Sequence, residues 1–595
     1  MTHTPTAAVW DELGGDPTLL SGMSTVARAG ALEAVLPVRE LARACVGACA
    51  LAAAELGALR AGLARVPRVS VDDGAVATAF VSERHLRVDG RAPLNFAPLS
   101  RFWRTADGWV RTHANYPHHR ARLLDALGAA DGASPEDVGA LLAGRSAREI
   151  EETVYAAGGL AVALRTPQEW AAHDQGRALA ERPLIEWGGP VGGGRGLGPD
   201  GGRGRGLGPL SGGGPLSPAA GVRVLDLTRV IAGPVATRTL ALLGADVLRV
   251  DAPRLPEDPD AHADTGFGKR SALLDLAADR PAFDELLASA DVVVTGYRPG
   301  ALDRFGLSPE ALAERRPGLV VAQVSAWGAY GPWGGRRGFD SLVQVATGIA
   351  VTEGSPERPG ALPAQALDHG TGYLLAAAVL RALTEREQRG HGRVVRLALA
   401  RTAQWLTNGI GREEGPAGSE AGKREGIGTR TGTGTGSGTR TGTGTGTRTW
   451  TGTGSGAGTE TGAGAGAGTG AGSGAGSGSG AGAGSGAGAG SGSGAGAGSG
   501  AGAGAGTGAG TGAGTGSGSG TGSGTGSGSG REEGAGVGPE VLAGEPYGRP
   551  DAWLSERDSP LGRLVHALPP VSFAGGPADW SRPPGRWGTD TARWS

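Results

Sequence analysis

The sequence predicts an α/β protein whose large domain is a doubly wound, parallel, Rossmann-like sheet, with a smaller α+β domain beside it. Short apolar runs alternate with helical segments between residues 222 and 325, which is the pattern of successive βαβ units. A run of good helix formers from 373 to 383 is long enough for a buried core helix. Glycine-rich stretches at 188–217 and 411–536 separate these parts, so we expect domain boundaries there.

Residues 1–187 are expected to form a helical segment followed by a small-domain-like unit. An Ala/Leu-rich helix is predicted from 38 to 65, because proline at 67 would end it. It carries Arg43 and Glu55, so a core helix is favoured over a membrane span. A short strand is predicted at 68–71. Further on, the Asp107-Gly108 pair between aromatic and β-branched residues indicates a hairpin.

Two helix starts in this first part are marked by a hydroxyl residue before a proline. Ser134 and Thr166 each stand in that position, and Thr166 is followed three residues later by Glu169. A capping hydroxyl with proline at the first helical position is a typical N-terminus, and the glutamate completes a capping box. Helices are therefore expected to begin at 135 and 167.

The large domain is expected at 218–410, with strands at 222–227, 245–250, 291–295 and 319–325 and with helices at 234–243, 281–288 and 309–314. Ligands of such sheets bind at the carboxyl ends of the strands. Here those ends carry Arg229, Tyr297, Arg298 and the neighbouring loops.

Composition and charge exclude several classes of partner. The formal net charge is −2, so neither nucleic acid nor a membrane is expected as a partner. The first thirty residues lack a signal pattern, and a cytoplasmic location is expected. Cys45 and Cys49 lie four apart on the predicted core helix, which suggests neither a disulfide nor a zinc site.

A metal site is conceivable at His113, His118 and His119. Pro117 lies among them and prevents the regular helical spacing that would aim them at one ion. We therefore expect a solvated or anion-facing loop, and no metal.

The tract from 411 to 536 consists mainly of Gly alternating with Thr, Ser or Ala. Such a tract cannot bury enough apolar surface to offset its ordering entropy, so disorder is predicted; the tract could equally be an expanded repeat. Residues 537–595 regain Trp, Pro and apolar content and are expected to dock as a tail on the large domain.

Asp368 is the candidate catalytic residue, because it stands just before the apolar helix from 373 to 383. Free N–H groups and the helix dipole at such an N-terminus would keep a carboxylate ionised, as a nucleophile requires. The local sequence favours the simpler interpretation that Asp368 is the N-cap of this helix, as most Asp residues before apolar helices are, so a nucleophilic role needs support from the rest of the chain.

Cationic residues are expected to gather at the same edge of the sheet. A cluster on successive loops would suit a phosphate-rich nucleotide, whereas scattered arginines would be a solvated surface. The residues concerned are Arg229, Lys269, Arg270, Arg298, Arg304, Arg336 and Arg337.

A dinucleotide-dependent dehydrogenase is a further alternative, because Asp251 ends the second strand where an acidic residue would bind a ribose. The first turn has one glycine, Gly233, where the dinucleotide fingerprint has three. The sequence therefore disfavours this class.

Two separated segments recur at one constant offset. Residues 36–41 resemble 362–367, and 69–71 resemble 395–397, each 326 positions apart. This indicates a remote internal duplication. At that offset Asp368 corresponds to Ala42, so only the second copy would keep the carboxylate.

Six stretches between 218 and 406 resemble, in unbroken order, the family III coenzyme A transferases (the CaiB/BaiF type, with formyl-CoA and carnitine-CoA transferases). They are VLDLTRVIAGP (224–234), LGADVLRV (243–250), GKRSALLD (268–275), YRPGALDR (297–304), GFD (338–340) and LD (367–368). Residues 95–185 resemble the family's small domain and 568–591 its C-terminal tail. Because the small-domain-like part comes first here, residues 1–187 are expected to be a degenerate first copy.

The resemblance implies an acyl-CoA transferase. Asp368 would attack an acyl-CoA thioester, form a mixed anhydride and then an aspartyl-CoA thioester, and pass CoA to an acceptor carboxylic acid. Acyl-CoA would be a substrate, with no tightly bound cofactor, and a homodimer would be the assembly. The positions that match the family's CoA contacts are Ile231, Ala232, Leu274, Gly296, Tyr297, Arg298, Arg304 and Arg337.

This sequence departs from the family at several positions. An arginine often found after the second strand is Ala252 here, and the small-domain segment contains no recognisable glycine-rich active-site loop. Relatives that act as α-methylacyl-CoA racemases use a histidine that would fall at Phe339, which cannot carry a proton. A racemase is therefore disfavoured, and a non-catalytic CoA-binding or scaffold protein remains the alternative.

Overall fold

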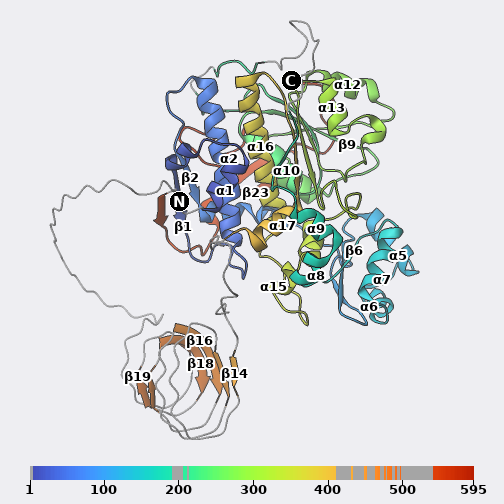
Figure 1. Cartoon of the computed structure of the whole chain (residues 1–595), viewed down its shortest axis with the longest axis vertical. Coiled ribbons are helices and arrows are strands. Elements are labelled where there is room, and N and C mark those ends of the chain that lie inside the picture. Colours follow the sequence, from blue (N-terminus) through green and yellow to red (C-terminus); the bar gives the residue numbers. More distant parts are fainter. Residues whose placement is uncertain are drawn as a thin grey trace, which may run out of the picture. The chain divides into compact units, whose positions relative to one another are not determined.

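A seven-stranded sheet forms the centre of the chain's larger unit (Figure 1). Its strands lie in the order β10-β9-β8-β11-β12-β13-β7; the first six are mutually parallel, and β7 pairs antiparallel with β13. Their bounds are β7 Glu186–Trp187, β8 Arg223–Leu227, β9 Asp246–Asp251, β10 Arg270–Leu273, β11 Val292–Thr295, β12 Val320–Ser325 and β13 Val394–Ala398. The α/β class is confirmed. The β10 strand had no sequence prediction, because it is short and begins with polar Arg270 and Ser271.

The computed structural model describes residues 4–94, 96–189, 206–210, 214–410 and 540–595, and the backbone of short strands between 430 and 497. The chain divides into two units, of which the larger holds residues 1–413 and 534–595 and the smaller holds 414–533.

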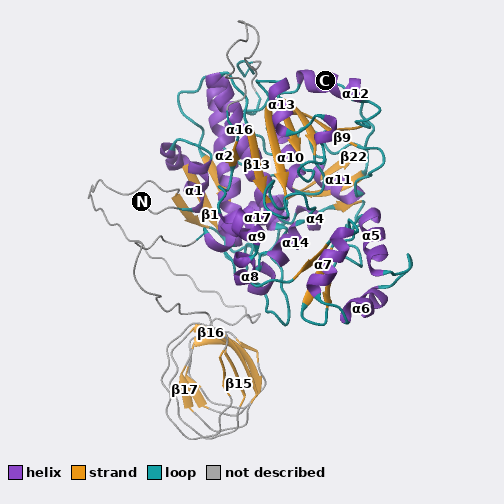
Figure 2. Ribbon diagram, turned by 45° about the vertical axis from the view of Figure 1, so that its right-hand side comes forward, coloured by secondary structure: helices purple, strands orange, loops and turns teal. Residues whose placement is uncertain are grey.

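Helices cover both faces of the sheet (Figure 2). Along β11, Val292 and Val294 join one apolar cluster, while Val293 between them joins another. This alternation follows from the period-two geometry of a strand. The first cluster includes side chains of α2 (Val38–Ala61), α10 (Ala232–Leu242) and α16 (Ala366–Arg389); the second includes α12 (Arg280–Ser289) and α13 (Pro309–Arg315).

Helices α2 and α16 lie side by side (Figure 1). Each has 24 residues and ends at a left-handed glycine, and Glu55 of α2 pairs with Arg381 of α16. Among the described helices, α2 is long and apolar enough to cross a membrane, yet 89% of its most apolar window is buried inside the protein. It packs as the core helix that the sequence predicts.

The same succession of elements follows both of these helices. After α2 come β2 (Val69–Asp72) and α3 (Asp73–Ala79), and after α16 come β13 and α17 (Leu399–Asn408). Strand β2 pairs with β1 (Met23–Ala27), which pairs with β21 (Glu540–Ala543). The matching order supports the hypothesis of an internal duplication.

The small-domain-like unit has its own apolar cluster. The predicted hairpin is present, with Asp107 and Gly108 between β4 and β5, and the predicted capping hydroxyls of Ser134 and Thr166 both form capping boxes. The bounds are β4 Phe102–Arg104, β5 Trp109–Thr112, β6 Ala161–Ala163, α5 Pro117–Leu127, α6 Pro135–Ala143, α7 Ala147–Ala156, α8 Pro167–Ala172 and α9 Asp174–Ala180.

The C-terminal segment contacts the large domain through tryptophans. The indole N–H of Trp580 donates to the backbone carbonyl of Arg238 at 2.8 Å, and that of Trp587 donates to Asp251 at 2.9 Å. Its strands β22 (Leu554–Ser559) and β23 (Gly562–Ala567) pair with each other, and β23 also pairs with β3 (Arg87–Val88). The remaining helices of this unit are α1 Pro5–Glu12, α4 Ser82–His85, α11 Pro259–Thr265, α14 Asp340–Ala346 and α15 Ile349–Thr352.

Most of the two predicted flexible segments lies outside the described residues. Of the 188–217 segment, Leu207 and Gly208 accept hydrogen bonds from Arg60. The disorder predicted for 411–536 is not confirmed. Parallel strands are assigned there at β14 Arg430–Gly432, β15 Arg448–Thr451, β16 Ala463–Thr469, β17 Ala475–Ser477, β18 Ser479–Ser485, β19 Ala489–Ser491 and β20 Gly496–Ala497.

The close approach of α10 to α16 makes Gly372 a sensitive position. A Cβ there would lie 2.6 Å from the carbonyl oxygen of Ala232 and 2.9 Å from Cβ of Val235. We expect Gly372→Ala to lower the free energy of unfolding by about 1–3 kcal/mol, measured by chemical denaturation. Gly139→Ala in α6 is the control, because its Cβ would meet Trp103 at an ordinary 3.6 Å. Equal stability of the two variants would contradict this packing.

Candidate active site

Asp368 lies in the first turn of α16 and is not its cap. The N-cap residue is Gln365, with no side-chain capping bond. Instead, the Asp340 carboxylate of α14 accepts the backbone N–H groups of Leu367 and Asp368, each at 2.9 Å. The alternative of a simple N-cap at Asp368 is therefore wrong. The capping carboxylate comes from the neighbouring helix.

Asp368 is 6% exposed, and no described residue forms a hydrogen bond with its carboxyl group. Burial raises its pKa well above the usual range, and the nearby Asp340 and Glu83 carboxylates raise it further. The helix N-terminus was expected to favour the charged form of this group, but the pKa is shifted in the opposite direction. The first N–H groups of α16 are already occupied by Asp340, and Asp340 brings its own negative charge to the helix end.

Asp340 differs from Asp368 in that its carboxylate is hydrogen-bonded. Burial raises its pKa to about 6, while the two backbone N–H groups and the Gln344 amide favour its charged form. Because the two carboxyl groups have such different partners, their proton affinities differ.

His369 points away from Asp368, as expected. Its ring is fully buried, lies against the Phe80 ring with centroids 5.3 Å apart, and places Nε2 3.4 Å from Oε2 of Glu83. Glu83 belongs to α4, in the first part of the chain. Burial alone would raise the pKa of Glu83, but His369, a backbone hydrogen bond and Arg84 together lower it.

The predicted CoA-contacting residues all follow carboxyl ends of parallel strands. Ile231 and Ala232 follow β8, Leu274 follows β10, Gly296, Tyr297, Arg298 and Arg304 follow β11, and Arg337 follows β12. Strands β8, β11 and β12 are neighbours in the sheet. Gly296, Arg298, Arg304 and Arg337 are exposed, whereas Ala232 and Leu274 are buried. These positions share one edge of the sheet.

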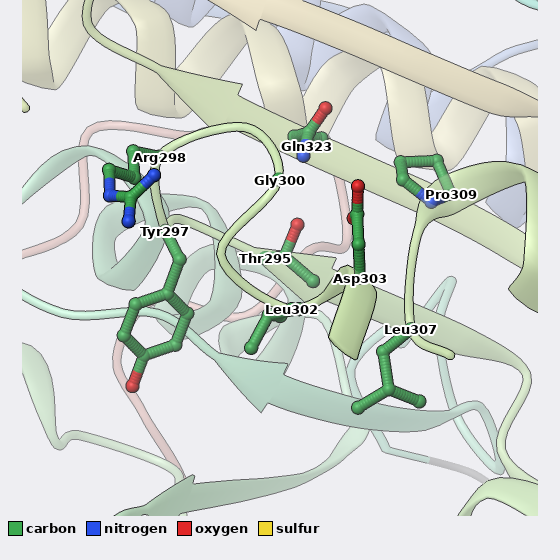
Figure 3. A pocket seen from close by; sticks show the side chains of 9 residues that line it. All are labelled: Thr295, Tyr297, Arg298, Gly300, Leu302, Asp303, Leu307, Pro309 and Gln323. Atoms are coloured by element: carbon green, nitrogen blue, oxygen red, sulfur yellow. The ribbon is translucent and has the colours of Figure 1, made fainter. Parts of the chain in front are cut away.

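A pocket opens beside β11 and β12 at this edge (Figure 3). Tyr297 and Arg298 line it together with polar Thr295, Asp303 and Gln323. The Thr295 hydroxyl is buried and has no hydrogen-bond partner among the described residues. Arg304, next to Asp303, stacks on Phe305 and does not line the pocket.

The predicted cationic cluster is smaller than the sequence suggested. Lys269 is buried, with Nζ 3.0 Å from Asp226, and burial lowers its pKa to about 8. Arg270 pairs with Asp246 at the opposite end of the strands, and Arg336 pairs with Glu152. These three have structural partners. By contrast, Arg298, Arg304 and Arg337 form no ion pair with any described carboxylate.

Residues of the first part of the chain cover the loops after β8 and β12. The Tyr155 hydroxyl donates to the backbone carbonyl of Arg337 at 2.9 Å, and the His113 ring stacks on Phe339 with centroids 3.7 Å apart. The guanidinium of Arg229 lies over the Tyr116 ring. Sequence reasoning missed these contacts, because no local motif links segments so far apart.

Two of the three clustered histidines are buried, which corrects the expectation of a solvated loop. Burial lowers the pKa of His113 to about 3 and that of His119 to about 2, so both are neutral at pH 7. His118 is exposed. Within the described ranges, no group of three possible metal ligands occurs.

Asp251 is not available for a ribose. Its carboxylate is 1% exposed, pairs with Arg249 at 2.7 Å and accepts the indole N–H of Trp587. These contacts satisfy the oxygens that a dinucleotide site would need. They argue against the dehydrogenase alternative, in agreement with the missing glycines.

The raised pKa of Asp368 predicts how stability depends on pH. Its carboxyl group holds a proton more tightly when folded, so ionisation opposes folding, and the wild type loses stability as pH rises from the ordinary carboxyl pKa of the unfolded chain to the raised pKa of the folded state. Asp368→Asn removes that loss. We expect this variant to have a higher Tm than the wild type at pH 8, with the difference disappearing toward pH 4.

Asp284→Asn is the matched control, because the Asp284 side chain is 38% exposed and its pKa is lowered by Arg280. It should gain no Tm at pH 8. A wild type that is more stable than Asp368→Asn at pH 8 would contradict the electrostatic description of the site.

Residues 219–434 match the model of CoA-transferase family III. A probable fatty acyl-CoA transferase, Rv3272 of Mycobacterium tuberculosis, is 37% identical over 201 residues, which are 31% of this chain and 51% of that protein. The formyl-CoA:oxalate CoA-transferase of Streptomyces coelicolor is 35% identical over 193 residues, 30% and 47% of the two chains. A CAIB/BAIF family structure from Brucella suis is 28% identical and covers 33% of this chain and 59% of that one, with a TM-score of 0.30. The chain spans about half the length of these two curated relatives, and its residues 219–434 are similar to CoA-transferase family III.

Proposed function

We propose that this chain is an acyl-CoA transferase that uses Asp368 as its nucleophile. The observation that carries the proposal is the state of the Asp368 carboxyl group. It is nearly dry, has no hydrogen-bond partner among the described residues, and stands at the start of a helix in the family III segment. A carboxylate without strong partners keeps its lone pairs available for attack.

The proposed reaction balances at every step. The Asp368 carboxylate attacks the thioester carbonyl, forming the mixed anhydride and releasing CoA thiolate. The thiolate attacks the aspartyl carbonyl, releasing the first acid as a carboxylate and leaving an aspartyl-CoA thioester. An acceptor carboxylate then attacks that thioester, forming a second mixed anhydride and releasing CoA thiolate. The thiolate attacks the acyl carbon of the acceptor acid in this anhydride, which gives the new acyl-CoA and restores the Asp368 carboxylate. Low exposure of Asp368 protects both anhydrides from water.

The raised pKa of Asp368 fits this chemistry. A more basic carboxylate is a stronger nucleophile, and its negative charge leaves the site when the new acyl bond forms. Repulsion from Asp340 therefore destabilises the ionised starting state more than the anhydride.

We infer that the sheet is doubly wound and that CoA binds along its carboxyl edge. The strand order reverses between β8 and β11, and ligands of such sheets bind at this reversal. Arg298 and Arg337 are exposed there and pair with no carboxylate of the described residues, as a site for phosphate groups requires. Acyl-CoA and a carboxylic acid would be the substrates.

Two expectations remain part of the proposal: a cytoplasmic location and a homodimer. Because α2 covers one face of α16 within the same chain, a second copy would have to use another surface. A racemase finds no support at Phe339, whose ring stacks on His113.

Replacing the nucleophile distinguishes an enzyme from a non-catalytic CoA-binding protein. We expect Asp368→Asn to reduce acyl exchange on the order of 10³-fold or more, measured with a panel of acyl-CoAs and labelled free acids. Hydroxylamine should trap an adduct at Asp368 in the wild type, identified by peptide mass. Asp284→Asn should exchange normally. Unchanged exchange by Asp368→Asn would overturn the mechanism, and binding without exchange in the wild type would favour the scaffold alternative.

Removing Arg298 tests the nucleotide site separately. Loss of a phosphate contact worth about 1.5–3 kcal/mol should raise KM for acyl-CoA roughly 10- to 100-fold in Arg298→Ala, with kcat little changed. A thioester of pantetheine, which lacks the nucleotide, should show no such rise. Arg389→Ala is the control, because Arg389 is exposed at the far end of α16. Equal KM changes for both thioesters would place the phosphates elsewhere.

A further inference from the structure

The first part of the chain brings a third carboxylate to the Asp368 site. Glu83 stands on α4, 285 positions before Asp368 in the sequence, and its Oε2 lies 3.4 Å from Nε2 of His369. Phe80, from the same segment, stacks on His369 and on Tyr373 one turn further along α16. Thus residues 80–83 contact the first turns of α16 directly.

Building on the proposed function, we propose that Glu83 is a positioning residue for Asp368: it fixes the first turn of α16 through His369 and places a negative charge that opposes the charged form of Asp368. It touches no reacting atom. Glu83 acts on Asp368 through the His369 side chain and through the electrostatic field of its own charge at the Asp368 carboxyl group.

Few other charges face this region from the packed elements. Helix α14 contributes Asp340. Arg84, whose side chain is 45% exposed, pairs with Glu83, with Nε 3.5 Å from Oε1. From α10, Arg238 is paired with Asp264. The remaining contacts of the first turns are uncharged: α2 presents Leu41 and Cys45 to Gly370, and α17 presents Thr402 to Thr371.

The proposed role has a consequence for the reaction. When Asp368 attacks, its negative charge moves onto the departing thiolate, so repulsion from Glu83 is relieved as the anhydride forms. The same repulsion makes the carboxyl group harder to ionise, in the direction shown by its raised pKa. Glu83 therefore lowers the ionised fraction of Asp368 at low pH, but it makes the attack faster once Asp368 is ionised.

Glu83→Gln should reveal both effects. We expect the acid limb of the kcat profile to move to lower pH, while kcat on the alkaline plateau falls several-fold; the two profiles should cross. Glu83→Asp keeps the charge on a shorter side chain and should recover the position of the acid limb. A merely structural role would scale kcat equally at every pH.

An infrared titration measures the same group without catalysis. The protonated C=O band of Asp368, identified by its loss in Asp368→Asn, should disappear at a lower pH in Glu83→Gln than in the wild type. Glu55→Gln is the control, because Glu55 also joins the first part of the chain to α16, but at Arg381; it should leave this midpoint unmoved.

An unchanged infrared midpoint in Glu83→Gln overturns the inference. A moved midpoint in a protein that exchanges no acyl groups would support the charge coupling and reject the proposed function, so the two failures are distinguishable. If Glu83→Gln does not fold, Glu83→Asp decides between the outcomes. An acid limb that stays at the wild-type pH supports the positioning role, and a displaced acid limb contradicts it.

Discussion

The site depends on the hydrogen bonds by which Asp340 caps α16. One carboxylate oxygen accepts the N–H groups of both Leu367 and Asp368, so the helix end is satisfied by a neighbour on α14. This leaves the Asp368 carboxyl group with neither a capping role nor another described partner. Had Asp368 capped its own helix, its oxygens would be held by backbone N–H groups and would be poorer nucleophiles.

Burial gives this arrangement its chemical character. Asp368 is only 6% exposed, and two other carboxylates lie close enough to raise its pKa. Stability and reactivity therefore oppose each other at this position, as is common where a fold holds a reactive group. The surrounding core compensates: α16 is buried along most of its length between α2, α10 and the sheet.

The first part of the chain contributes to the site as well as to the core. Its helix α2 packs along α16, its α4 segment places Glu83 beside His369, and its small-domain unit contacts the loops before Asp340. The loops after β11 and β12 carry Arg298 and Arg337, which have no carboxylate partner among the described residues, whereas Lys269 and Arg270 are paired within the fold. A cation is available to a ligand when it has no ion pair with a carboxylate, and its position in the sequence does not decide this.

By itself, the sequence determined the elements and the place of the candidate nucleophile. Alternating apolar runs specified four of the parallel strands, the Asp-Gly pair specified the hairpin, and the helix formers after Asp368 specified α16, because periodicity and turn chemistry are local properties. Only the tertiary structure decided that Asp340 caps α16, that Asp251 is occupied by Arg249, and that Glu83 faces His369. Those facts depend on side chains brought together from distant segments, and burial then sets their protonation, which no local pattern encodes.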